Sequence, residues 1–196
     1  MATTISFTNY NNEPLSKQQV SASDAYLKVY KINGIIKKIE YYDNGEFDGI
    51  EYFKDNSENL NDIFTNLGTN SLVVTQKENI NNYLIKTSIS YKNGIVSHTE
   101  KELSLNGKII CVHELNANNE LKIKDCIKYL YDENGSEIGE EILNFRYNED
   151  GSLYAISGSD YPFSEYNQSL YGNDILLYFP NLLTENPYYV NINFLP

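Results

Sequence analysis

The sequence contains few of the residues that cross-link, anchor or charge a protein positively. Its 196 residues include two cysteines and one arginine, and no segment is apolar for long enough to span a membrane. A chain of this length buries about 70% of its unfolded surface in one domain, so it requires no disulfide framework and no structural metal. The N-terminus lacks a basic, apolar leader. We therefore expect a single domain over residues 1–196, located in the cytoplasm.

Basic residues are outnumbered by acidic ones. The chain has 27 Asp and Glu residues against 15 Lys and Arg residues, and its net charge is −12. Nucleic-acid affinity comes mainly from Lys and Arg neutralising phosphates, so we expect no nucleic-acid partner. A basic protein surface complements this charge, although acidity also keeps a protein soluble without any partner.

The cysteines and histidines give little support to a metal or redox site. Cys111 and Cys126 both lie in apolar, strand-like segments, which favours two packed thiols in a reducing compartment; a bridge stays open if their strands are neighbours. With His98 and His113 they could in principle bind zinc, but the short spacings of zinc sites are missing. Cys111 could also act as a nucleophile with a histidine base, yet nothing local marks it as activated. We expect no metal and no cofactor.

Asn-Gly pairs recur between segments rich in Ile, Val, Leu and Tyr, at Asn33-Gly34, Asn44-Gly45, Asn93-Gly94, Asn106-Gly107 and Asn134-Gly135. Such a pair is the strongest local signal for a two-residue hairpin turn, because a type I′ turn needs positive φ at both central residues. The pattern therefore predicts a mainly β fold, an extended antiparallel meander of hairpins over residues 25–159. About eight to ten strands are expected, after an N-terminal lead-in over residues 1–24.

One segment breaks the strand pattern. Over residues 58–67, Leu60, Ile63, Phe64 and Leu67 fall on one helical face. This spacing predicts a short helix that covers one face of the sheet. Ser57 is the expected N-cap and Gly68 the expected C-terminal stop.

The C-terminal segment, residues 160–196, is punctuated by proline and rich in aromatic residues: Tyr161, Phe163, Tyr166, Tyr171, Tyr178, Phe179, Tyr188, Tyr189 and Phe194. So many aromatic side chains cannot all remain in water. We expect this tail to pack across the sheet as a second layer. The alternative is that part of it forms an aromatic recognition patch.

A weak internal repeat accompanies the turns. Residues 42–49 and 131–139 both read Tyr-Asp, then Asn-Gly, then three residues and Gly, and residues 147–153 have a related form. In each, Tyr closes a strand, and in the first two the later Gly would permit a bulge or a close backbone approach. This pattern resembles the degenerate hairpin repeats of bacterial tyrosine-aspartate (RHS-like) proteins and of MORN-variant proteins of toxin-antitoxin systems. The resemblance implies a small bacterial protein of the immunity type, and it transfers no functional residue.

Catalytic motifs are poorly represented. Asp132-x-Asn134-x-Ser136 is similar to the start of a calcium loop, but Glu137 stands where that loop needs Gly. A glycosidase pair among the acidic residues near 137–150 is disfavoured, because residues 140 and 141 point to opposite faces of a strand. The phosphate-binding loop, the nucleophile elbow and the dinucleotide fingerprint are all missing. We expect a protein that is not an enzyme.

The sequence thus predicts a non-catalytic binding module, most concretely an acidic immunity protein that blocks a basic toxin domain. The predicted partner-binding residues are acidic residues on turns and edges together with two tyrosines of the tail: Asp43, Glu46, Asp48, Glu137, Glu140, Glu141, Tyr161 and Tyr166. The alternative is a module that binds carbohydrate or another ligand through exposed Tyr side chains.

Overall fold

The computed structural model describes residues 2–67, 70–136, 139–158, 162–163 and 169–196, with the backbone alone for 132–136 and 139–141. By its internal contacts the chain forms two compact units. Unit 1 comprises Met1–Lys77 and Thr87–Thr99, and unit 2 comprises Glu78–Lys86 and Glu100–Pro196. Each unit is described by itself.

The strands are β1 (Thr3–Thr8), β2 (Pro14–Leu15), β3 (Tyr26–Ile32), β4 (Ile35–Asp43), β5 (Glu46–Phe53), β6 (Ser71–Ile80), β7 (Tyr83–Lys92), β8 (Ile95–Leu105), β9 (Lys108–Asn116), β10 (Ile127–Ser136), β11 (Gly139–Tyr147), β12 (Leu153–Ser157) and β13 (Ser169–Tyr171). The helices are α1 (Lys17–Val20), α2 (Leu60–Leu67), α3 (Asn173–Tyr178) and α4 (Leu182–Glu185), with short 3₁₀ turns η1 (Ile123–Asp125) and η2 (Pro187–Tyr189).

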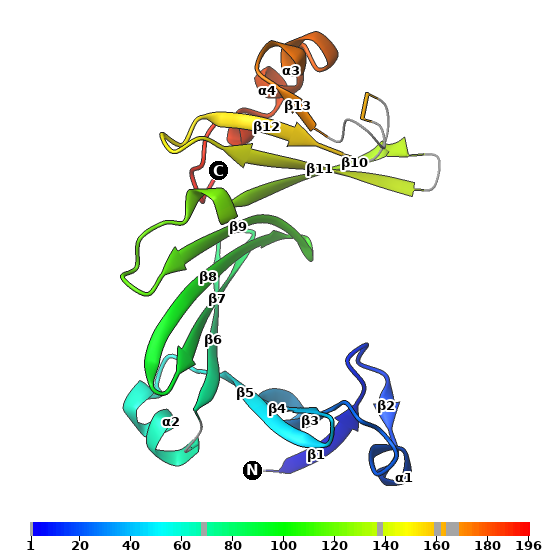
Figure 1. Cartoon of the computed structure of the whole chain (residues 1–196), viewed down its shortest axis with the longest axis vertical. Helices are drawn as coiled ribbons and strands as arrows, with labels where there is room; N and C mark the ends of the chain where they lie inside the picture. The colour runs from blue at the N-terminus through cyan, green and yellow to red at the C-terminus, as the bar shows by residue number, and fades with distance from the viewer. Residues whose placement is uncertain (1, 68–69, 137–138, 159–161, 164–168) are drawn as a thin grey trace. The chain divides into compact units, whose positions relative to one another are not determined.

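The predicted antiparallel meander is confirmed. From β3 to β13 the strands follow one another in the sheet in sequence order, and β1 and β2 add to its other end (Figure 1). The described residues form thirteen strands, more than the eight to ten expected. The extra strands come from the lead-in and the tail. Thr3–Thr8 pairs with β3 along its whole length, although its polar Thr and Ser residues gave no apolar signal.

Four of the five predicted hairpin turns have the expected backbone conformation. Asn33, Asn44, Asn93 and Asn106 have φ values of 50° to 54°. The glycines that follow them have φ values of 74° to 83°. Positive φ at both residues is the signature of a type I′ turn, and each pair joins strands that are neighbours in the sheet.

The fifth predicted turn is wrong. Asn134 and Gly135 lie inside β10, which continues to Ser136 and pairs there with Gly139 of β11. The register of this pairing shifts between Asp132 and Ser136, and the pairing resumes at Ser136. Strand pairing on both sides of the Asn-Gly pair thus overrides its turn preference. Residues 137–138, which separate β10 from β11 in the sequence, lie outside the described residues.

One strand pair departs from the antiparallel pattern. β5 and β6 are parallel, with Ile50 opposite Leu72 and Phe53 opposite Thr75. A parallel pair needs a long crossover, usually a helix, and α2 fills that role between them. The predicted helix at residues 58–67 is thus confirmed, and its position in a crossover explains why the strands on either side of it run in the same direction.

The apolar face of α2 packs as predicted. Leu60, Ile63, Phe64 and Leu67 contact a core that includes Ile50, Leu72, Val74 and Tyr91 of unit 1, and α2 lies beside β6 (Figure 1). The predicted cap is wrong, because the helix begins at Leu60 and its preceding residue, Asn59, is the cap. The Asn59 side-chain oxygen accepts from the backbone N–H of Asn61 at 2.8 Å. The expected stop, Gly68, lies outside the described residues.

Gly49 shows why the repeat carries a glycine after its turn. The pairing of β4 with β5 shifts register between Tyr41 and Tyr42, which is the predicted bulge. A Cβ atom at Gly49 would lie 2.8 Å from the side-chain oxygen of Ser71. No larger residue fits this approach without displacing Ser71.

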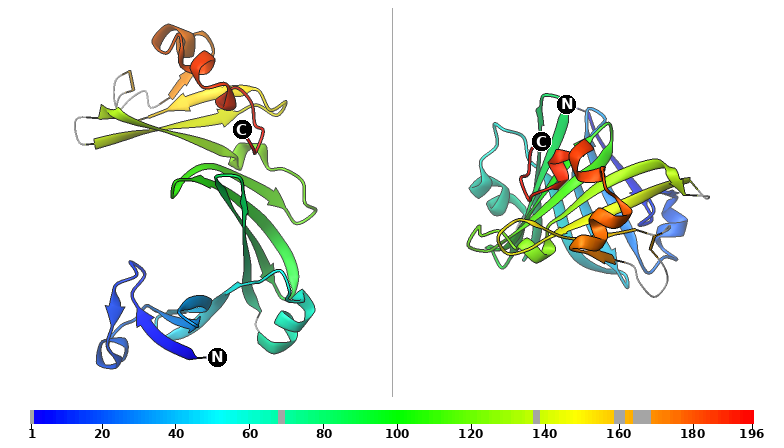
Figure 2. Two further views of the ribbon diagram at one scale, coloured as in Figure 1. Left: turned by 180° about the vertical axis from the view of Figure 1, so that it is seen from behind. Right: turned by 90° about the horizontal axis from the view of Figure 1, so that it is seen from above.

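The tail packs across the sheet of unit 2, as predicted (Figure 2). Its buried residues Phe163, Leu170, Ile175 and Tyr189 share one core with buried residues of β11 and β12. These strand residues are Leu143, Phe145, Tyr147 and Ile156. The end of the tail also docks on the Asn148–Gly151 turn, where the N–H of Ile192 donates to the carbonyl of Gly151 at 3.0 Å.

Lys128 links the sheet of unit 2 to the tail. Its side chain is fully buried, its ammonium group donates to the Tyr188 carbonyl and lies 3.4 Å from the centroid of the Tyr188 ring. Burial lowers the pKa of Lys128 to about 8 because desolvation disfavours the charged form. A cation–π contact and one carbonyl therefore replace the water that Lys128 loses.

We predict that Tyr189→Ala destabilises the protein by about 3–5 kcal/mol, the usual cost of removing a buried aromatic ring. Tyr189 is 7% exposed, contacts Phe145 and donates its hydroxyl to the Tyr129 carbonyl at 3.0 Å. The control is Leu177→Ala in the same tail, because Leu177 is 71% exposed and should change stability by less than about 0.5 kcal/mol. Urea unfolding measures both. Equal, small losses would show that the tail is not structural.

A second prediction concerns pH. The pKa of Lys128 is lower in the folded state than in the unfolded state. At pH values between these two pKa values the unfolded state binds more protons, so the contribution of Lys128 to stability increases as the pH rises. Its titratable neighbours are Tyr147, Tyr188, Cys111 and His113. Burial raises the pKa of the Cys111 thiol to about 11. Burial and the charge of Lys128 lower the pKa of His113 to about 4. These groups do not titrate in the folded state between about pH 7 and 9.5.

The measurement is the unfolding free energy of the wild type and of Lys128→Met across about pH 7 to 9.5. The wild type should gain stability relative to the variant as the pH rises. A constant difference between the two proteins would show that Lys128 keeps an ordinary pKa. Because both proteins carry the same tyrosines, tyrosine ionisation in the unfolded state cancels in the comparison.

Candidate functional site

The first three predicted binding residues gather at the turn between β4 and β5 in unit 1. Asp43, Glu46 and Asp48 are all exposed, and Asp43 lies opposite Glu46 across the turn. Within the described residues, none of the three carboxylates forms an ion pair. By contrast, Lys28 on β3 and Lys37 and Lys38 on β4 are all paired. The turn therefore presents three uncompensated negative charges.

Aromatic rings line the sheet beside this turn. Tyr26 and Tyr42 are stacked with ring centroids 4.6 Å apart. Phe47 meets Tyr42 edge-to-face at 5.9 Å, and Phe7 meets Tyr26 at 6.1 Å. Cross-strand register explains the row, because Tyr26 is opposite Tyr42 and Tyr42 is opposite Phe47. We call these four residues the aromatic row.

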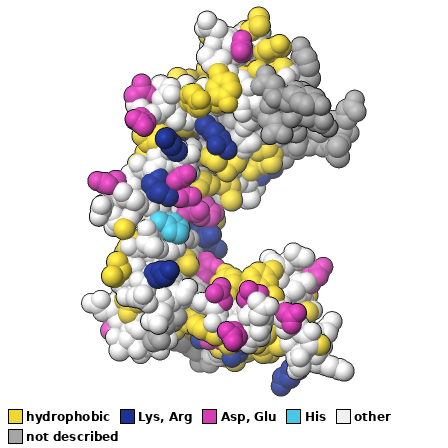
Figure 3. All heavy atoms as spheres, in the orientation of Figure 1, with side chains coloured by type: hydrophobic (Ala, Val, Ile, Leu, Met, Phe, Trp, Pro, Cys, Tyr) yellow, Lys and Arg dark blue, Asp and Glu magenta, His cyan; other side chains and the backbone are white. Residues whose placement is uncertain are grey.

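Tyr10 borders the same turn from the other face of the hairpin, because its ring contacts Tyr41, which points away from the face that carries Tyr42. It lies 6.2 Å from Tyr41 between ring centroids, and its hydroxyl donates to the Tyr42 carbonyl at 3.3 Å. Burial and the charges of Asp43 and Asp48 raise the pKa of Tyr10. Tyr10 is 48% and Phe47 47% exposed, so two large aromatic side chains stay partly in water beside three carboxylates. Figure 3 shows Asp and Glu side chains around hydrophobic ones over this part of unit 1.

A charged network holds the middle of the same sheet. Glu40 accepts from Lys38 at 2.6 Å, from the Tyr30 hydroxyl at 2.9 Å and from the Tyr42 hydroxyl at 3.3 Å, and it pairs with Lys28. Burial alone would raise the pKa of Glu40, but its hydrogen bonds and the lysine charges lower it overall. Glu40 thus fixes Tyr30 and Tyr42 on the same face of the sheet as the aromatic row.

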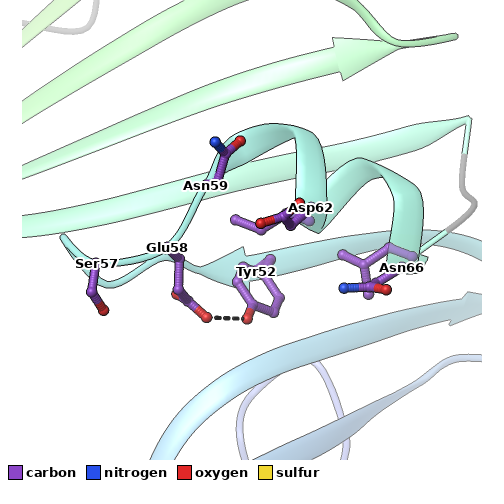
Figure 4. A pocket seen from close by; sticks show the side chains of 8 residues that line it. Tyr52, Ser57, Glu58, Asn59, Asp62 and Asn66 are labelled. Carbon is purple, nitrogen blue, oxygen red and sulfur yellow. Dashed lines mark hydrogen bonds between the residues drawn. The ribbon is translucent and has the colours of Figure 1, made fainter.

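A small pocket lies between β5 and α2. It has a volume of about 310 Å³ and presents Tyr52, Glu58, Asn59, Asp62 and Asn66 (Figure 4). The Tyr52 hydroxyl donates to Glu58 at 2.6 Å. Burial and this bond raise the pKa of Tyr52 to about 12, so the hydroxyl stays a donor at neutral pH.

Glu58 is already satisfied in this pocket. Lys37 donates to it at 2.6 Å, and the backbone N–H of Asp55 does so at 2.7 Å. Hydrogen bonds from Lys37, Tyr52 and Asp55 outweigh burial and lower the pKa of Glu58. The carboxylate is therefore ionised and unsuited to act as a general acid at neutral pH. Glu58, just before α2, thus connects Lys37 of β4 and Tyr52 of β5 through hydrogen bonds.

The other predicted site residues cannot be assembled into a surface. Glu137, Tyr161 and Tyr166 lie outside the described residues. Glu140 and Glu141 belong to β11, in the stretch where the backbone alone is described. Their role in binding stays a prediction.

Cys111 and Cys126 are free, buried thiols, as expected. Burial raises the pKa of Cys111 to about 11, which keeps the thiol protonated and makes it a poor nucleophile at neutral pH. Within the described ranges, no group of three or more His, Cys, Asp or Glu side chains could hold a metal ion. In the same ranges, no helix has the length and apolarity needed to cross a bilayer.

Sequence reasoning found the acidic residues but missed the aromatic row and Tyr10. A signal was available for Phe47, which is the second residue of the strand that follows the Asn44-Gly45 turn. No comparable local signal marks Tyr10, whose position depends on the docking of the lead-in against β4. No protein-family model, curated protein or solved structure matches this chain.

We predict that Glu40→Gln costs about 1–3 kcal/mol, because it leaves two lysines without their shared carboxylate. The pKa of Glu40 is lower in the folded state than in the unfolded state. Glu40 therefore stabilises the fold at pH values above its unfolded-state pKa, and this stabilisation is lost as the pH falls through its folded-state pKa. The variant should therefore lose less stability in acid than the wild type. The control, Glu46→Gln on the same hairpin, should stay within about 0.5 kcal/mol. Equal effects in denaturant titrations would contradict the role of Glu40.

Proposed function

We propose that this chain is a non-catalytic protein-binding module that captures a basic partner through the end of the β4–β5 hairpin. The observation that carries the proposal is the combination of uncompensated Asp43, Glu46 and Asp48 with the half-exposed Phe47 and Tyr10. Aromatic residues are enriched in the buried centres of protein interfaces. Unpaired carboxylates at the rim steer a cationic partner and set its orientation.

The support is physical. Exposed apolar side chains flanked by polar ones mark binding surfaces when they are contiguous, and the rings of the aromatic row contact one another in sequence. The Glu40 network holds Tyr42 in place before any partner arrives. Such preorganisation reduces the entropy lost on binding. In the terms of the resemblance given above, the partner is a basic toxin domain and the chain is its cytoplasmic, bacterial immunity protein.

The alternative proposal, carbohydrate binding through exposed tyrosines, rests on a different surface. In unit 2, Tyr154 is 50% and Tyr171 47% exposed, with ring centroids 5.2 Å apart. Tyr154 borders an open cavity of about 730 Å³ that is also lined by Arg146 and Asn148. A ring with polar neighbours suits a sugar face and its hydroxyl groups.

The test is affinity capture from a lysate of the source organism with mass spectrometry of the captured proteins. The variant Asp43→Asn/Glu46→Gln/Asp48→Asn should reduce capture of a basic protein by about tenfold or more, and capture by the wild type should weaken as salt rises. The matched control is Glu78→Gln/Asp174→Asn/Glu185→Gln, which removes three exposed carboxylates elsewhere.

Each outcome decides between the proposals. Loss of capture in the hairpin variant alone supports the site. Equal losses in both variants would mean that net charge, not this surface, attracts the partner. Glycan-array binding that survives the hairpin variant, without capture of any protein, would favour the carbohydrate alternative.

A further inference from the structure

The crossover from β5 through α2 to β6 creates a cavity at one end of these strands. β5 pairs with β6 in parallel and with β4 in antiparallel orientation. In open sheets, ligand sites form beyond the carboxyl ends of parallel strands, where neighbouring connections diverge. In unit 1 the chain leaves the carboxyl end of β5 at Phe53, and an open cavity of about 760 Å³ lies there.

One wall of this cavity is apolar. It is formed by Ile32, Ile35 and Ile36 at the β3–β4 turn and by Phe53. Ile35 is 74% and Ile36 37% exposed, although both are β-branched residues that usually pack against neighbours. Both side chains therefore remain accessible to solvent at the wall of the cavity. Apolar walls with a few polar groups are typical of small-molecule sites of this size.

Two lysines carry the unpaired charges of this cavity. Within the described residues, Lys54 and Lys77 form no ion pair, and Lys77 lies 5.4 Å from the centroid of the Phe53 ring. Lys54 donates only to the Asp55 carbonyl, at 3.1 Å. The third lysine of the cavity, Lys37, pairs with both Asp55 and Glu58, at 2.7 and 2.6 Å, so these two carboxylates share one positive charge. The three lysines and two carboxylates of this cavity therefore leave a net charge of +1, and two of the ammonium groups have no carboxylate partner within the described residues.

We propose that this cavity binds a small amphipathic anion, an aliphatic carboxylate whose chain lies on the isoleucine wall and whose head group meets Lys54 and Lys77. The chain excludes water from the apolar wall, and the carboxylate supplies the charge that the two lysines lack. The site is distinct from the acidic hairpin end and does not depend on the proposed protein partner. A basic pair within a chain of net charge −12 is also selective, because the rest of the surface repels anions.

The probe is octanoate, titrated into the ¹⁵N-labelled full chain while amide chemical shifts are followed. Saturable shifts should map to residues 32–37, 53–58 and 75–77. Octanol has the chain without the charge, and acetate has the charge without the chain. Both should bind about tenfold more weakly or worse. Octanol binding as tight as octanoate, shifts elsewhere, or no saturation up to about 10 mM would overturn the proposal.

Two substitutions separate the charge from the chain. Lys54→Gln/Lys77→Gln should weaken octanoate binding by about tenfold or more, whereas the exposed pair Lys92→Gln/Lys124→Gln should leave it unchanged. Ile35→Ser should weaken binding, and Ile95→Ser should not. Ile95 is the matched control because it follows Asn93-Gly94 as Ile35 follows Asn33-Gly34, and it is 72% exposed. Equal effects of site and control variants would contradict the site, and the exposure of both isoleucines keeps the fold intact.

Discussion

The two-residue turn is the constraint on which the architecture depends. When Asn and Gly both take positive φ, the chain reverses at once, and the next strand can only pair with the one before it. Repeating this step places successive strands side by side, as their order in the sheet shows. Between β5 and β6 it is the strand direction that differs, because residues 54–70 are long enough for a crossover that leaves the two strands parallel.

Local signals predicted the fold well, and long-range pairing explains where they failed. Asn-Gly and the helical spacing of Leu60, Ile63, Phe64 and Leu67 act within a few residues, so sequence alone reveals them. Whether the strand after α2 runs parallel or antiparallel to β5 is not encoded in its own residues, since Leu72 to Val74 are apolar either way. The lead-in was missed because β1 gains stability from backbone pairing with β3, which side-chain polarity does not report.

The candidate site divides in the same manner. Asp43, Glu46 and Asp48 could be predicted because exposed carboxylates follow from turn positions and composition. The contacts of Lys37 could not be predicted from the sequence. β4 carries an irregularity that leaves Lys37 between the residues paired with Tyr30 and Lys31, and such bulges redirect a side chain. This single unpaired residue lets one lysine form ion pairs with both Asp55 and Glu58, and no periodicity in the sequence predicts it.

The Asn-Gly turns also determine how the protein ages chemically. Because glycine offers no side chain to obstruct ring closure, the next backbone nitrogen readily attacks the side-chain amide carbon of the preceding asparagine and displaces ammonia. Water then opens the succinimide to aspartate or isoaspartate. Aspartate adds a negative charge to a chain that already carries −12. Isoaspartate lengthens the backbone by one methylene inside a turn of two residues. Slow deamidation would therefore alter strand register and surface charge first, and leave the packed cores of the two units untouched.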